Sequence, residues 1–272
     1  MLYLIATPIG NLGDITYRAV EALASADEIW CEDTRHTGIL LNHLGIKKPL
    51  VSCHEHTEKS RAALLTEKLR AGLSIAYVSD AGMPGISDPG ALLVQACLEE
   101  GLSYTVLPGA CAFVTAAVLS GLDTSTLCFF GFLPRTGKER KERLAKIAAC
   151  GATAILYESP HRVHDTLGEL LTLLGDVPAC LCRELTKLHE TARRGTLRSL
   201  FDETETEVRG ECVLLVSVPE QKPVVSAEDP DSLLRRLLGE MSTKDAAAEA
   251  SRLTGISRKQ AYARALEIRD EL

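Results

Sequence analysis

The sequence lacks any long apolar run. A membrane-spanning helix needs about 18 or more consecutive apolar residues, and no stretch of the 272 residues reaches that length. Residues 1–6 also lack the basic start and extended apolar stretch of a signal peptide, and they are typical of a first strand. We therefore expect a cytoplasmic protein without a membrane segment.

The cysteines lack the arrangement of a disulfide framework or a metal site. Nine are scattered along the chain, most in apolar surroundings, and no CxxC pair occurs. Their odd number favours free, buried thiols in a reducing compartment. Cys180 and Cys182 are more typical of a core strand than of metal ligands, and His54 and His56 form only a weak metal pattern. We expect no metal.

The common nucleotide-binding and nucleophile motifs are missing as well. There is no GxxxxGK(S/T) phosphate loop, no GxGxxG after the first strand and no HExxH pair. A GxSxG nucleophile elbow is also absent. The chemistry then needs neither an obvious metal nor a covalent nucleophile. Transfer of a group from a bound donor, governed by how the reactants are positioned, fits these absences.

Excess positive charge is lacking too, because the formal net charge is −7. This argues against a protein that coats nucleic acid by bulk electrostatics, but it leaves room for a local basic patch. Such a cluster lies within nine positions and contains Arg135, Lys138, Arg140, Lys141 and Arg143. A solvated helix face is the alternative reading of this cluster.

What the sequence does contain is a regular alternation of strands and helices. In the first half, apolar strands are predicted at residues 2–6, 28–31, 49–53, 73–78 and 103–107, with helices between them. This spacing predicts a mainly parallel, doubly wound sheet. The alternation restarts at residue 128 and closes with a strand at 211–218. Two α/β domains are therefore expected, at 1–121 and 122–220.

The C-terminal part has a different pattern. Residues 219–230 are polar and contain proline, which predicts a linker. Helical segments are expected at 232–240, 244–253 and 258–271, which form a small domain at 231–272. Their spacing suits a helix-turn-helix, and a helical appendage that packs on the body is an equal alternative.

The most informative stretch is residues 77–90, a loop between a buried strand and a helix. It holds three glycines, two prolines and two aspartates. Connections of this type usually run about 2–6 residues, and this one is longer. Such a loop at the end of a strand is a place where α/β sheets bind ligands. Because it contains no basic residue, we expect a rigid backbone cradle and not a phosphate site. Asp88 is expected to cap the helix that follows.

Five motifs, taken in order, resemble one family. They occupy residues 6–14, 32–35, 79–90, 157–162 and 183–187. Together they resemble the bacterial 16S ribosomal RNA cytidine 2′-O-methyltransferases, within the tetrapyrrole methylase superfamily. The segment Thr7-Pro-Ile-Gly-Asn11 favours the RNA branch, because porphyrinoid methylases tend to have a Gly-x-Gly-Pro-Gly-Asp type of loop there. The resemblance covers residues 1–220, and the tail resembles the family's small C-terminal domain.

This resemblance implies two doubly wound α/β domains of tetrapyrrole methylase type, a small helical domain, and a homodimer. It implies S-adenosylmethionine in the cleft between the α/β domains and 2′-O-methylation of a cytidine in 16S ribosomal RNA of the small subunit. A methyltransferase for a porphyrin-like molecule is the alternative. The residues that it assigns to the cofactor are Pro8, Ser79, Asp80, Ala81, Gly82, Pro84, Ile86, Cys111, Ala112, Tyr157, Glu158 and Leu185.

Three side chains are candidates to accept the proton of the ribose hydroxyl: Asp80, Glu158 and His161. They stay unranked, and capping of a local turn is the alternative role of Asp80. Possible RNA contacts through charge-assisted bonds or polar contacts are Asn11, Arg35, Arg135, Lys138, Arg140, Lys141, Arg162, Arg183 and Arg193. An ion pair with Asp33 is the alternative for Arg35, and a structural contact to Glu184 is the alternative for Arg162.

A function of a different class is a DNA-binding regulator built on the C-terminal helices. The acidic net charge and the position of those helices at the end of the chain weigh against it. An enzyme that methylates ribosomal RNA is the leading hypothesis.

Overall fold

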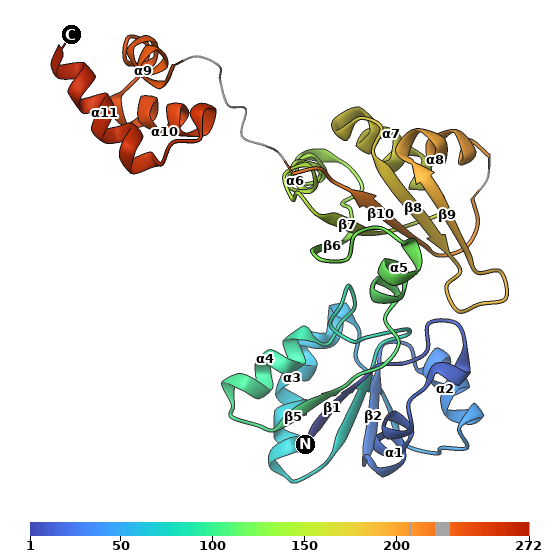
Figure 1. The fold of residues 1–272 in the computed structure, drawn as a ribbon. Coiled ribbons are helices and arrows are strands. Elements are labelled where there is room, and N and C mark those ends of the chain that lie inside the picture. Colours follow the sequence, from blue (N-terminus) through green and yellow to red (C-terminus); the bar gives the residue numbers. More distant parts are fainter. Residues whose placement is uncertain (207, 221–228, 272) are drawn as a thin grey trace. The chain divides into compact units, whose positions relative to one another are not determined.

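A computed structural model describes residues 1–206, 208–220 and 229–271, and it divides the chain into units at 1–218 and 219–272 (Figure 1). The larger unit contains two five-stranded sheets. The smaller unit is a bundle of helices. Within the described residues, no helix is both long and apolar enough to cross a membrane.

The first sheet has the order β3-β2-β4-β1-β5, and all its neighbouring strands run parallel. Its strands are β1 (Leu2–Ile5), β2 (Glu28–Cys31), β3 (Leu50–Ser52), β4 (Ile75–Val78) and β5 (Tyr104–Leu107). The central strand β4 is buried along its whole length, as expected when helices cover both faces of a parallel sheet.

Helices do cover both faces of this sheet. They are η1 (Leu12–Asp14), α1 (Tyr17–Ser25), α2 (Thr34–His43), α3 (Glu55–Arg70) and α4 (Ala91–Glu99). Leu23 of α1 packs on one face with Ile29 and Val78. Leu65 of α3 and Leu93 of α4 pack on the other face. The doubly wound arrangement predicted from the strand–helix alternation is confirmed.

The second sheet has the order β6-β7-β10-β8-β9 and is mixed. Its strands are β6 (Leu127–Phe132), β7 (Thr153–Glu158), β8 (Pro178–Arg183), β9 (Thr191–Thr196) and β10 (Cys212–Ser217). Only β6 and β7 pair in parallel. The loop between β8 and β9 holds no helix, and a connection that short permits only an antiparallel pair. Strand β10 inserts between β7 and β8 and runs opposite to both.

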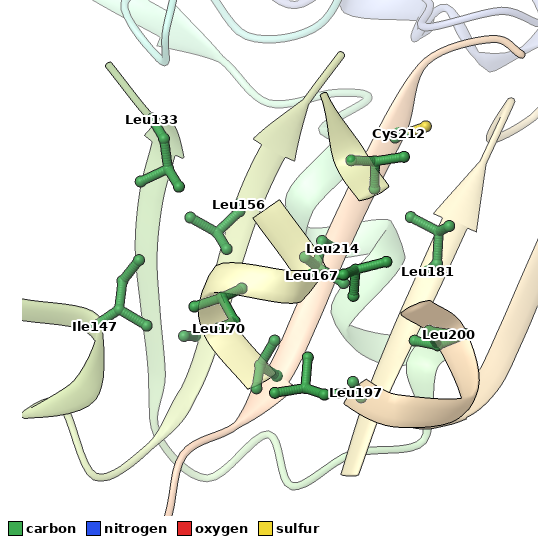
Figure 2. Packing of buried hydrophobic residues seen from close by; sticks show 14 of the residues in the cluster. Leu133, Ile147, Leu156, Leu167, Leu170, Leu181, Leu197, Leu200, Cys212 and Leu214 are labelled. Atoms are coloured by element: carbon green, nitrogen blue, oxygen red, sulfur yellow. The ribbon is translucent and has the colours of Figure 1, made fainter. Parts of the chain in front are cut away.

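The second sheet is also covered on both faces. One face carries α6 (Gly137–Ala148), α7 (Val163–Leu174) and α8 (Leu197–Glu203) over the apolar cluster of Figure 2. The other face carries α5 (Ala112–Ser120), whose Ala116 packs with Ile155 and Cys180. Helix α5 precedes the expected domain boundary at residue 121, yet it packs on the second sheet. The chain thus crosses from one sheet to the other between β5 and α5.

The smaller unit contains α9 (Pro230–Leu238), α10 (Thr243–Thr254) and α11 (Arg258–Glu271). Leucines of α9 and alanines of α10 and α11 share one core. Gly255 ends α10 in a left-handed conformation, and the Ser257 hydroxyl accepts a hydrogen bond from the Gln260 amide. Three helices form where three were predicted. Residues 221–228 of the expected linker lie outside the described residues.

The start of α4 fixes the end of the long loop that follows β4. The N-cap residue is Gly90, which has no side chain to cap the helix. The Glu58 carboxylate of α3 does this instead, and it accepts hydrogen bonds from the amides of Gly90, Leu92 and Leu93 at 2.8, 2.9 and 3.3 Å. The prediction that Asp88 caps this helix is therefore wrong, because a neighbouring helix supplies the carboxylate.

Replacing Glu58 with Ala should lower the free energy of unfolding by about 3 kcal/mol, since Glu58 is only 5% exposed and three amides lose their acceptor. Urea unfolding measures this loss. Glu67 is a matched control because it lies exposed on the same helix, and Glu67→Ala should change stability by less than about 0.5 kcal/mol. Equal stability of the two variants would contradict the capping role of Glu58.

Candidate functional site

A cavity of about 350 Å³ lies between the two sheets of the larger unit. The loop after β4, the residues between β5 and α5, and the ends of β6, β7 and β10 all contribute to its wall. Its lining residues are Ile9, Asp80, Ala81, Gly82, Met83, Ile86, Ser87, Asp88, Cys111, Ala112, Phe132, Tyr157, Glu158, Ser159, Pro160, Glu211, Cys212 and Val213. The carboxyl ends of parallel strands are where α/β folds bind ligands.

The five sequence motifs meet around this cavity. Thr7 and Gly82 exchange backbone hydrogen bonds of 2.9 and 3.0 Å, which join the first loop to the loop after β4. The Asp33 amide donates to the Asp80 carboxylate at 3.0 Å, which adds the motif at residues 32–35. A Cβ on Gly10 would come within 2.4 Å of the Lys187 side chain, so the first loop also lies against residues 184–187. Residues 157–160 complete the wall.

Most residues assigned to the cofactor lie on this wall. Those that line it are Asp80, Ala81, Gly82, Ile86, Cys111, Ala112, Tyr157 and Glu158. Pro8 and Ser79 line a hollow of about 70 Å³ next to Asp80. Pro84 is buried within the loop. Leu185 is buried in the apolar cluster that also contains Ile9, behind the cavity wall.

An aromatic contact closes the cavity on the side of the second sheet. The Tyr157 hydroxyl accepts a hydrogen bond from the Phe113 amide at the start of α5, at 3.2 Å. The ring centroids of Tyr157 and Phe132 lie 5.5 Å apart, and those of Tyr157 and Phe129 lie 5.0 Å apart. Phe132 lines the cavity and remains 56% exposed. It thus presents an apolar ring to any ligand.

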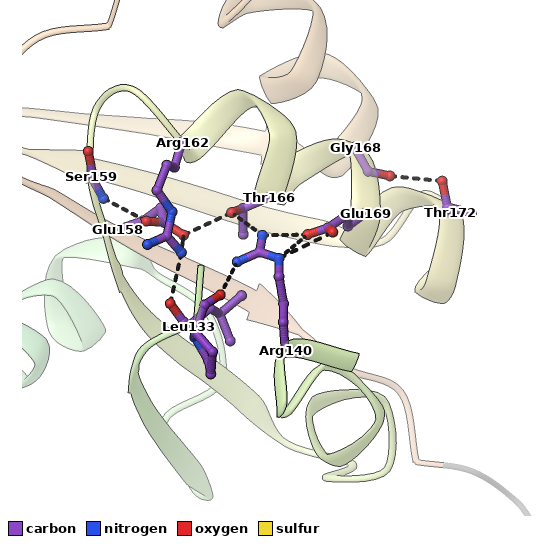
Figure 3. Close-up of polar contacts among 10 residues, drawn as sticks. Leu133, Arg140, Glu158, Ser159, Arg162, Thr166, Gly168, Glu169 and Thr172 are labelled. Carbon is purple, nitrogen blue, oxygen red and sulfur yellow. Dashed lines mark hydrogen bonds and ion pairs between the residues drawn. The ribbon is translucent and has the colours of Figure 1, made fainter. Parts of the chain in front are cut away.

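The charged side chains that line the cavity are all carboxylates. They belong to Asp80, Asp88, Glu158 and Glu211. Glu158 is nearly inaccessible and accepts hydrogen bonds from the Ser159 amide, the Arg162 guanidinium and the Thr166 hydroxyl (Figure 3). Glu211 is exposed and pairs with Lys187 at 2.9 Å. Asp80 and Asp88 thus carry most of the negative charge toward the cavity, which favours a cationic ligand.

Asp88 has an unusual electrostatic environment. Burial, followed by the charges of Glu32 and Asp80, raises its pKa to about 6 against a hydrogen bond from Ser79 that lowers it. Burial and Asp80 likewise raise the pKa of Glu32. Within the part of the chain that the structure describes, no group of three or more His, Cys, Asp or Glu residues is arranged to hold a metal ion.

The three expected proton acceptors have different surroundings. Asp80 lines the cavity, although one of its oxygens already accepts the Asp33 amide. The carboxylate of Glu158 is committed to three donors within the second domain. His161 is exposed just before α7 and does not line the cavity. Of the three, Asp80 has the geometry closest to the expected role.

Two of the arginines expected to contact RNA are held inside the second domain. Arg140 is 7% exposed and donates to Glu169, to Thr166 and to the Pro134 carbonyl (Figure 3). Arg162 donates to the Leu133 carbonyl at 2.8 Å and pairs with Glu158. The ion-pair partner of Arg162 is thus Glu158, and not Glu184, which the sequence analysis gave as the alternative. These two guanidiniums brace β7, α6 and α7 and leave little for a phosphate.

The remaining expected RNA contacts lie at the surface. Asn11 caps the short helix η1 through a bond from the Gly13 amide, and Arg35 pairs with Asp33 while its side chain stays 90% exposed. Arg183 donates to the Arg209 carbonyl, and Arg193 pairs with Glu203. The exposed basic side chains of the α6 region are Arg135, Lys138, Lys141, Arg143 and Lys146.

Several lining residues were not anticipated from the sequence. Met83, Ser87 and Asp88 line the cavity and belong to the loop at residues 77–90, which was predicted to bind a ligand, so the sequence could have indicated them. Phe132 and the start of β10 were not, because nothing in the sequence indicated that β10 inserts beside β7. The only usable signal was an aromatic residue at the end of a predicted strand.

This geometry is that of a known fold. Residues 1–200 match the family model described as Tetrapyrrole (Corrin/Porphyrin) Methylases. The chain belongs to this family, and it is a methyltransferase. Residues 224–269 match the model described as RsmI C-terminal HTH domain. The family resemblance and the fold class expected from the sequence are confirmed.

Relatives with high identity extend along nearly the whole chain. Ribosomal RNA small subunit methyltransferase I of Haemophilus influenzae is 45% identical over 271 residues, which cover 96% of this chain and 95% of that protein. The protein of the same name from Synechocystis sp. is 45% identical over 273 residues, with 98% of each chain covered.

Solved structures share the fold at low identity. Diphthine synthase has a TM-score of 0.63 at 15% identity, covering 79% of this chain and 88% of that chain. Uroporphyrin-III C-methyl transferase from Thermus thermophilus, complexed with S-adenyl homocysteine, has a TM-score of 0.58 at 18% identity and covers 79% and 96%. These likenesses support the two-sheet fold and carry no further assignment.

Arg140→Ala should lower the free energy of unfolding by about 1–2 kcal/mol, because it removes a buried guanidinium together with its hydrogen bonds to the Pro134 carbonyl and the Thr166 hydroxyl. Urea unfolding measures the change. Lys141 is exposed on the same helix, and Lys141→Ala should cost less than about 0.5 kcal/mol. Similar stabilities for the two variants would mean that Arg140 has no bracing role.

Proposed function

We propose that this methyltransferase uses S-adenosylmethionine to methylate the ribose 2′-hydroxyl of a cytidine in 16S ribosomal RNA. The observation that carries this proposal is the identity of about half the residues along nearly the full chain with proteins named ribosomal RNA small subunit methyltransferase I. The match of the tail to a domain model bearing the same family name adds to it.

The cavity suits the proposed donor. Its volume of about 350 Å³ lies in the range of small-molecule sites, and its wall is mainly apolar. S-adenosylmethionine carries a sulfonium and an ammonium group, and Asp80 and Asp88 provide the opposite charge. The backbone of Ala81 and Gly82 is exposed to the cavity between these carboxylates. The residues assigned to the cofactor from the sequence therefore remain our proposal for its site.

The donor supplies an electrophilic methyl group, so the chain has to align the reactants and take up one proton. The loop after β4 holds one side of the cavity through the bonds of Thr7 with Gly82 and of Glu58 with Gly90. Phe132 and Tyr157 form an apolar wall opposite. Rigid walls on both sides favour a single geometry for in-line displacement.

The RNA would be held by exposed basic side chains outside the cavity. Arg135, Lys138 and Lys141 lie in and beside the first turns of α6, Arg35 and Arg193 lie on other surface segments, and Arg183 is half-buried at the end of β8. Arg258 and Lys259 are exposed at the start of α11 in the smaller unit. Arg140 and Arg162 are left out of this surface because their guanidiniums are engaged internally. A cytoplasmic homodimer stays a prediction.

Small ribosomal subunits from cells that lack this protein should gain one 2′-O-methylcytidine when incubated with the purified enzyme and S-adenosylmethionine. Mass spectrometry of nuclease fragments locates the modified nucleotide, and subunits from cells that contain the protein are the control. Methylation of a porphyrin-like compound, with no change in the RNA, would contradict the proposal and favour the alternative substrate class.

A further inference from the structure

Asp88 is a carboxylate of the cavity that, among the described residues, neither caps α4 nor joins an ion pair. Glu58 caps the helix that Asp88 was expected to cap. Glu158 serves Arg162 and Thr166, and Asp80 holds the Asp33 amide. Asp88 lines the same cavity, from the segment between the Gly82 turn and the fixed start of α4. Its position is therefore maintained by other residues.

The charged groups that act on Asp88 are carboxylates. The neighbouring charged groups are Glu32 at the end of β2 and Asp80 of its own loop, and a hollow behind it adds Glu55 and Glu58 of α3. The charge of Asp88 in turn contributes to raising the pKa values of Tyr77 and Tyr157, after the larger effect of burial. Among the described residues that line the cavity and this hollow, none is Lys, Arg or His. The Ser79 hydroxyl donates a hydrogen bond to Asp88.

Resting on the proposed function, we propose that Asp88 accepts the proton of the ribose hydroxyl during methyl transfer. The O–H bond breaks, and its electron pair stays on the ribose oxygen. That oxygen bonds the methyl carbon as the carbon–sulfur bond breaks, and the electron pair of that bond returns to sulfur. The proton forms an O–H bond with the Asp88 carboxylate and later passes to water. Charge balances, since a sulfonium and a carboxylate become a thioether and a carboxylic acid.

The buried position of Asp88 and its neighbouring carboxylates give it a pKa that suits this role. A general base works best when its pKa lies near the working pH. Burial with Glu32 and Asp80 raises the pKa of Asp88 from 3.8 to about 6. Asp88 is then ionised above pH 6, ready to accept a proton, and it is protonated and inactive as the pH falls below that value. Activity should accordingly be lost on the acid side.

The test is a single-turnover assay with radiolabelled S-adenosylmethionine and small subunits that lack the modification, followed between about pH 5 and pH 9. Wild-type protein should show a rate that rises with pH around pH 6 and then levels. Asp88→Asn should lower the plateau rate by about 100-fold or more and remove that rise. Calorimetry should still detect binding of S-adenosylmethionine, weakened by the loss of one carboxylate from the cavity wall, which also shows that the variant is folded.

Glu32→Gln provides a second variant that keeps Asp88. Removing this neighbouring negative charge lowers the pKa of Asp88, so the rise in rate should move to lower pH while the plateau rate remains. An unchanged midpoint would overturn the proposal, even if Asp88→Asn failed to fold. Asp88→Asn that keeps its rate, or keeps the rise around pH 6, would overturn it as well. If the wild-type protein does not methylate the RNA, the proposed function itself fails.

Discussion

The site depends on the hydrogen bonds that the Glu58 carboxylate accepts from the start of α4. It lies in α3, yet its three hydrogen bonds fix the first turn of α4 and the end of the loop after β4. A buried carboxylate is costly unless donors surround it, and the free amides of a helix start meet that need. The other end of the loop is joined to Thr7 through Gly82. With both ends fixed, the residues between them face the cavity in one arrangement.

Helix α5 connects the first sheet to the second sheet, which forms the opposite wall of the cavity. It follows β5 of the first sheet but packs on the second, where Tyr157 accepts the Phe113 amide at its start. Arg194 of β9 donates to the carbonyls of Leu119 and Ser120 at its end. Both ends of α5 are therefore tied to the second sheet. The cavity between the two sheets consequently has walls that are each anchored by hydrogen bonds.

The sequence predicted local features better than long-range ones. Strand–helix alternation predicted the parallel first sheet, and glycines and prolines after β4 predicted a long loop, which lines the cavity. Both signals lie within short windows of the sequence. The insertion of β10 beside β7 and the capping of α4 by Glu58 depend on residues far apart in the chain, as does the burial of Arg140. Asp88 was misassigned for that reason. A helix cap is usually local, and only the fold reveals a carboxylate from another helix in that place.

We propose that the backbone around Gly82 forms the cradle for S-adenosylmethionine. Gly82 and Gly85 have nearly equal φ values of 78° and 83°, and only Gly82 lines the cavity. Alanine at either position carries a similar backbone strain of about 1 kcal/mol, so each controls for the other. Calorimetric titration should show that Gly82→Ala weakens binding of S-adenosylmethionine by about tenfold or more, while Gly85→Ala binds nearly as wild type. Equal affinities of the two variants would contradict the account.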